Sequence, residues 1–251
     1  MFNRQLAKVR AKNILHRNIL FLGALAAIPI IFNFVANFFT PTFSMGASAT
    51  YESLTQSQAN LVVKAYFNSL LVTIPVSFLI STVVAFFNYF LMLSAGYLSK
   101  HTASDAVPFS SLASFGGFIN FVLKVFVKNV IIALGYILLV VPGIYLTFRF
   151  YLVEQIAVDQ PELGIGETLT ESGILSKGSK LNFFVLDLSF ILWEMLALVS
   201  YGISNLYVLP YKTLTQFDVY EQLKSKLYPD QDYSQNANDN QQDDFVNTVE
   251  F

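Results

Sequence analysis

The chain has 251 residues, of which 54% are hydrophobic and 13% are charged, whereas an ordinary soluble domain has roughly 25% charged residues. Because whole runs of helical length carry no charge, the composition excludes a water-soluble globule and predicts an all-α polytopic membrane helix bundle. The chain contains no cysteine, which excludes disulfides, thiolate metal sites and a cysteine nucleophile.

The net charge of −2 hides an asymmetry between the two ends of the chain. Residues 1–18 carry five cations and no acid, so we predict a basic N-terminal segment on the cytoplasmic side of the membrane. Residues 218–251 hold eight acids and two lysines, and Asn, Gln and Asp dominate from Pro229 onward. We therefore predict that residues 224–251 form an acidic, disordered cytoplasmic tail.

A membrane domain is predicted over residues 19–223, and its first half contains three apolar runs of spanning length. The first span is 19–39, and the polar stretch 40–58 is placed outside. The second span, 68–98, contains Pro75, which predicts a tilted or kinked helix. A loop or short interfacial helix at 108–120 returns the chain to the third span, 124–141. That span begins with Lys124 and Lys128 on one helical face.

The second half of the membrane domain begins at Pro142-Gly143, which breaks the helix and permits a tight turn. Shorter spans are predicted at 144–158, 181–201 and 204–216, with an interfacial helix at about 161–176. With six spans, every Lys or Arg outside a span except Lys64 lies on the inner side, which the positive-inside rule favours. If 144–158 is not a span, four spans remain and residues 159–180 face outward.

Four ionisable residues fall inside the predicted spans, where such groups are costly and usually pair or face water. Arg149 and Glu154 lie on the fourth span; Asp187 and Glu194 lie on the fifth, seven residues apart and on one helical face. One hypothesis is a polar seam that binds an ion, a proton or a lipid headgroup. The alternative is that Arg149 pairs with Asp187 or Glu194 and locks two helices together.

Lys177 and Lys180 flank a glycine in the segment before the fifth span, and we expect them to contact anionic lipids of the inner leaflet. They are too few for a phosphate-binding loop. The two histidines stand apart, so no metal site is expected, and no cofactor motif is present. Neither a catalytic motif nor a basic and aromatic nucleic-acid surface occurs. The sequence therefore predicts neither an enzyme nor a nucleic-acid-binding protein.

Several short segments of the second half resemble a known family. They are Pro142-Gly143-Ile144, then Asp159-Gln160-Pro161-Glu162-Leu163, then Ser172 followed by Lys177-Gly178-Ser179-Lys180, in which the family usually has Asn in place of Ser179. The similarity continues through Leu186-Asp187-Leu188-Ser189-Phe190-Ile191 with Trp193, and through Pro210-Tyr211 with Thr215, Tyr220 and Leu223. The chain resembles the bacterial multi-pass family catalogued as domain of unknown function 975. It is distantly similar to the membrane domain of some glycerophosphodiester phosphodiesterases.

The resemblance implies a bacterial plasma-membrane protein of Gram-positive type, with no assigned activity. From the residues we expect both termini in the cytoplasm and a non-enzymatic accessory, assembly or protective role in the cell envelope. The expected partners are membrane lipids, with another membrane protein or self-association as further candidates. The alternative function is a small transporter or channel that uses the charged seam.

Overall fold

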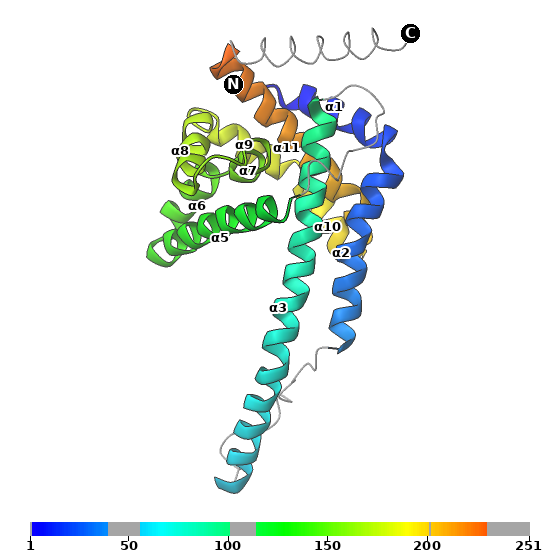
Figure 1. Ribbon diagram of the computed structural model, residues 1–251, viewed down its shortest axis with the longest axis vertical. Coiled ribbons are helices and arrows are strands. Elements are labelled where there is room, and N and C mark those ends of the chain that lie inside the picture. Colours follow the sequence, from blue (N-terminus) through cyan, green and yellow to red (C-terminus); the bar gives the residue numbers. More distant parts are fainter. Residues whose placement is uncertain (1, 40–55, 101–113, 201, 230–251) are drawn as a thin grey trace.

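The computed structural model describes residues 2–39, 56–100, 114–200 and 202–229. Every regular element in these ranges is an α-helix, which confirms the all-α prediction (Figure 1). Two of these helices are long and apolar enough to cross a membrane, or three if the bent pair α1 and α2 counts as one span. The six-span prediction is therefore not confirmed. The differences from it lie mainly after residue 139.

The N-terminal pair consists of α1 (Arg4–Arg17) and α2 (Ile19–Phe39). The Asn3 side chain caps α1 by accepting from the backbone N–H groups of Gln5 and Leu6, both at 3.1 Å. The two helices are bent by 92° at Asn18, so the basic helix lies across the axis of the apolar one. α2 has the bounds of the predicted first span, 19–39.

The longest helix, α3 (Gln56–Lys100), has 45 residues and passes through Pro75 without ending. Its spanning part, Pro75–Lys100, lies later than the predicted span 68–98. α2 packs beside α3, whereas the first part of α3 extends beyond the other helices (Figure 1). In this first part Leu61 is 67% exposed and Leu71 is 74% exposed, and a membrane or a second protein would cover such side chains.

A helical hairpin follows, made of α5 (Phe115–Leu138) and α6 (Val140–Arg149). α5 begins earlier than the predicted span 124–141 because Ser114 caps it, accepting from Gly117 N–H at 2.9 Å. The turn falls at Leu139, before Pro142. Gly135 and Gly143 allow the two helices to touch: a Cβ on Gly135 would lie 3.2 Å from the Gly143 Cα.

The predicted fourth and fifth spans are each broken into two short helices. After α6, a turn at Phe150 to Leu152 leads into α7 (Val153–Asp159), and this turn is buried in the protein core. Residues 181–201 divide into α9 (Lys180–Leu188) and α10 (Ile191–Val199). The Ser189 hydroxyl donates to the Leu186 carbonyl at this break, a bond that competes with the helical backbone pattern.

The remaining helices also differ from their predicted bounds. α8 (Ile165–Leu175) starts after Gly164, whose N–H is accepted by Glu167 Oε2 at 2.8 Å, and not at Pro161. The predicted sixth span, 204–216, is the first half of α11 (Asn205–Leu227), a continuous 23-residue helix. α11 carries five charged residues and packs against α1, α2 and α3, so its burial is inside the protein and not in lipid.

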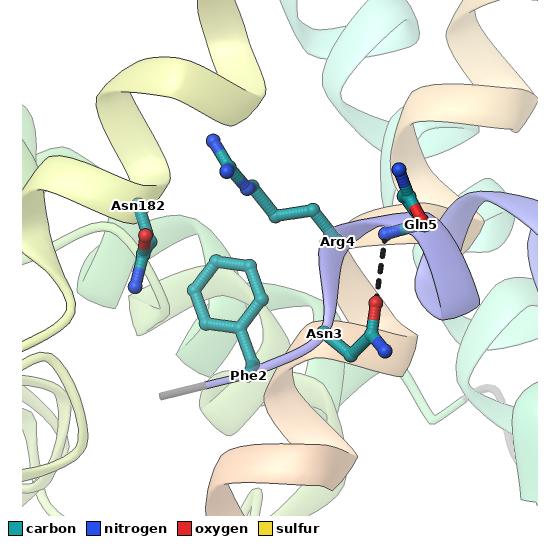
Figure 2. A pocket seen from close by; sticks show the side chains of 5 residues that line it. All are labelled: Phe2, Asn3, Arg4, Gln5 and Asn182. Carbon is teal, nitrogen blue, oxygen red and sulfur yellow. Dashed lines mark hydrogen bonds between the residues drawn. The ribbon is translucent and has the colours of Figure 1, made fainter.

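The two described ends of the chain lie at one end of the molecule, beside the last turn of α3 (Figure 1). The Asn3 N–H donates to Gln222 Oε1 of α11 at 2.7 Å. Phe2 stacks on Phe183 of α9, with ring centroids 5.3 Å apart. Figure 2 shows Phe2 between Arg4 and Asn182 in a shallow pocket at this contact. The start of α1, the start of α9 and the end of α11 thus form one layer.

Residues 230–251, and with them most of the predicted tail, lie outside the described residues.

Candidate functional site

A cavity of about 820 Å³ lies between α3, α5, α7 and α11. This volume falls within the range of small-molecule sites, roughly 300–1,000 Å³. Most of its wall is apolar, and five side chains with an amide or a charge also line it: Asn88, Asn129, Glu154, Lys212 and Gln216. Apolar walls with a few polar groups are the usual construction of a site for an amphiphilic ligand.

Glu154 lies in the first turn of α7, where the helix dipole stabilises its negative charge. Its carboxylate is paired with the ammonium of Lys128 from α5. The Lys128 side chain is 13% exposed and the Glu154 side chain is 31% exposed, so this pair is partly removed from solvent and joins α7 to α5. A charge from the α5 wall and a charge from α7 therefore neutralise each other at the cavity.

A network of polar side chains extends from the cavity into the helices behind it. Gln216 Nε2 donates to the Tyr151 hydroxyl at 3.1 Å, and this hydroxyl donates to Asp187 Oδ1 at 2.7 Å. Lys212 Nζ lies 2.6 Å from Glu194 Oε1 and 3.8 Å from Asp187 Oδ1. These contacts form a continuous network from the cavity to α9 and α10, and Lys212 is the cation at its centre.

The structure does not bring the four predicted seam residues together in one group. Asp187 and Glu194 are brought together, but through Lys212 and not through Arg149. Glu154 lines the same cavity as Lys212 and is paired with Lys128. The predicted pairing of Arg149 with Asp187 or Glu194 is absent from the ion pairs of the described residues.

Arg149 ends α6 and turns toward α8. Its guanidinium lies against the backbone of Gly173, where an added Cβ would meet Nε at 3.2 Å. The Lys180 ammonium lies 3.6 Å from the ring centroid of Tyr145, also on α6. Lys177 is exposed in the turn between α8 and α9. These three cations therefore lie around α6, α8 and α9, apart from the charged network.

Asp159 is a buried charge centre that the sequence analysis did not identify. It ends α7, its side chain is 3% exposed, and its carboxylate is shared by the ammonium groups of Lys100 and Lys224. The Tyr220 hydroxyl donates to Oδ2 at 2.6 Å. Burial alone would raise the pKa of Asp159, but Lys100, Lys224 and Tyr220 outweigh it and lower the pKa. The carboxylate therefore stays ionised and ties α3, α7 and α11 together.

The described residues contain no group of three or more His, Asp or Glu side chains that could hold a metal ion. A family model described as a protein of unknown function, DUF975, matches residues 12–227. The chain belongs to this family. No curated protein and no solved structure matches it. The comparisons do not show the distant similarity to glycerophosphodiester phosphodiesterases.

The DUF975 match includes the whole cavity and the Asp159 cluster. Two signals in the sequence pointed to residues that were overlooked. Lys212 is a cation inside the predicted span 204–216, where it needs a partner as much as Asp187 does. Asp159 and Tyr220 both belong to the segments that carry the family resemblance. No sequence signal indicated that Lys124 is 1% exposed and donates to the Pro161 carbonyl at 3.2 Å.

Proposed function

We propose that this DUF975 protein is a non-enzymatic accessory, assembly or protective protein of the bacterial plasma membrane. It acts by holding a lipid or another amphiphile in the cavity between α3, α5, α7 and α11. The observation that carries the proposal is the composition of this cavity: apolar walls on two long membrane helices, with polar groups that include Glu154, Lys212 and Gln216. Acyl chains suit the apolar walls, and a headgroup suits the polar groups.

The exposed apolar tips of two hairpins support a position in lipid. Around the α5–α6 turn, Ile137 is 78% exposed and Val141 is 77% exposed. Around the turn between α10 and α11, where Gly202 has a φ of +87°, Val199 is 77% exposed. Water disfavours such large exposed apolar side chains, whereas a bilayer covers them.

The proposed orientation places both ends of the chain in the cytoplasm. The start of α1, the last turn of α3 and the end of α11 lie at one end of the molecule (Figure 1). The positive-inside rule assigns a cation-rich end to the cytoplasm. The hairpins then enter the bilayer from this side and return to it.

The cavity proposal is tested by blocking the cavity and counting the lipids that remain bound. Ala85 lines the cavity, so Ala85→Trp fills it, whereas Leu192→Trp places the same indole side chain on the exposed surface of α10. Mass spectrometry after gentle detergent extraction measures the lipid retained per protein. We expect Ala85→Trp to lose lipid that the wild type and Leu192→Trp both keep. Equal retention in all three proteins would contradict the proposal.

The alternative, a small transporter or channel, is favoured by one observation: the charged network of Asp187, Glu194 and Lys212 opens into the same cavity. Such a protein moves an ion or solute across reconstituted vesicles. We expect Glu194→Gln to abolish that flux, while Glu162→Gln, a change at an exposed acid outside the cavity, leaves it unchanged. Absence of any flux in the wild type would remove this alternative.

A further inference from the structure

A second pocket, of about 230 Å³, lies where the turn between α8 and α9 meets the end of α11. Its lining divides by chemistry. Lys177 and Lys226 are cationic, Ser179 is a hydroxyl, and four aliphatic side chains complete it: Ile174, Leu175, Leu223 and Leu227. This pocket is separate from the large cavity, with which it shares no residue.

The two lysines come from segments that are 49 residues apart in sequence and converge only in the folded chain. Both are exposed, and neither belongs to the ion pairs of the described residues. By contrast, Lys224, two residues before Lys226 on α11, is paired with the buried Asp159. Lys177 and Lys226 therefore present two positive charges to one small hollow.

Two serine hydroxyls lie in the turn that carries Lys177, and one of them, that of Ser179, lines the pocket. Ser179 stands at the N-cap of α9 and is 3% exposed, yet its side chain makes no capping hydrogen bond. Ser176, in the same turn, is fully buried, and its Oγ has no hydrogen-bond partner among the described residues. Gly178 between them has a φ of +77°, a conformation that folds the turn tightly and brings Lys177 to the pocket.

We propose that this pocket binds the anionic headgroup of a phospholipid. Lys177 and Lys226 hold the phosphate, Ser179 donates a hydrogen bond to it, and Ile174 and Leu227, each 45% exposed, contact the start of the acyl chains. The volume is too small for a whole lipid and suits a headgroup. The position fits the proposed orientation, because the end of α11 lies at the cation-rich end of the molecule (Figure 1).

The test is a titration of the full chain in neutral detergent with short-chain phosphatidylglycerol or phosphatidylcholine, read by native mass spectrometry. We expect phosphatidylglycerol to bind more tightly, and the double variant Lys177→Gln with Lys226→Gln to weaken it roughly tenfold. The matched control, Lys12→Gln with Lys64→Gln, removes the same charge from exposed lysines outside the pocket and keeps the affinity. Equal affinity in both double variants would overturn the proposal.

Two further arms separate other sources of negative charge. If glycerol phosphate without acyl chains binds as tightly as phosphatidylglycerol, the apolar residues contribute nothing and a lipid site is excluded. If phosphatidylglycerol binds at Lys177 and Lys226 only after removal of residues 229–251, the acidic tail is the occupant and the proposal fails. Neither pair of lysines lines the large cavity, so lipid bound there contributes equally to both double variants. The difference between the two double variants therefore reports this pocket alone and is independent of the Ala85→Trp experiment.

Discussion

The Lys100 ammonium and the Asp159 carboxylate join the last residue of α3 to the last residue of α7, 59 positions apart in sequence. Lys224 of α11 binds the other oxygen of the same carboxylate at 2.6 Å. One buried acid therefore fixes the relative positions of a membrane helix, the short helix that carries the cavity residue Glu154, and the central helix that carries Lys212.

Replacing Asp159 should destabilise the protein more than replacing other acids. Asp159→Asn leaves Lys100 and Lys224 without their partner, and breaking a buried pair costs about 3–5 kcal/mol. We expect a loss of this order in the free energy of unfolding, measured by denaturant titration in detergent. Glu162→Gln is the control, because Glu162 is exposed and does not belong to the ion pairs of the described residues. A loss no larger than that of the control would show that the cluster does not hold the helices.

The same carboxylate predicts a dependence of stability on pH. Because folding lowers the pKa of Asp159 below its ordinary value of 3.8, the unfolded chain takes up the proton first as the pH falls. The stabilisation is therefore complete above that value and is lost as the pH falls through the lower pKa of the folded state. We expect the wild type to lose more stability than Asp159→Asn between about pH 7 and about pH 3. Parallel losses in the two proteins would contradict the assignment.

The Tyr220 hydroxyl contributes a separate part of this cluster. Burial and the neighbouring Asp159 raise the pKa of Tyr220, so the hydroxyl stays protonated and donates to the carboxylate. Hydrogen bonds to charged groups contribute about 1.5–3 kcal/mol. Tyr220→Phe should lower the free energy of unfolding by this amount, less than Asp159→Asn does. Tyr228→Phe, which loses a longer bond of 3.2 Å to Glu171 nearer the surface, should cost less.

The α5–α6 hairpin depends on the absence of a side chain at Gly135. A methyl group there would meet Leu146 Cδ1 at 2.7 Å and the Gly143 backbone at 3.2 Å, so Gly135→Ala should cost about 1–3 kcal/mol. Gly116→Ala is the matched control on the same helix, because its Cβ meets nothing within 4 Å and helix propensity favours Ala. Thermal unfolding followed by circular dichroism compares them. Destabilisation by both variants alike would remove the close-packing argument.

The sequence predicted the positions of the helices better than it predicted which of them cross the membrane. The apolar run 19–39 became α2, and the apolar runs around Pro75 and after Lys128 became α3 and α5, because burial of a long uncharged segment requires a helix in lipid or in a core. The spans at 144–158, 181–201 and 204–216 were predicted from hydropathy and the positive-inside rule, and hydropathy cannot distinguish lipid from the interior of a protein. The burial of Leu152, Phe183 and Leu214 inside the helical layer accounts for the difference.

For the candidate site, too, the sequence determined one part and the tertiary structure another. The sequence by itself indicated that Glu154, Asp187 and Glu194 lie in apolar segments, but the analysis overlooked Lys212 and Asp159. Only the tertiary structure decided their partners, Lys128 and Lys212, because the partner of a charge is set by helix packing between residues distant in sequence. Composition and local pattern predict a helical membrane protein, because they determine the free energy of transferring each segment out of water. The cavity, the Asp159 cluster and the pocket at Lys177 and Lys226 depend on contacts between segments, which local pattern does not record.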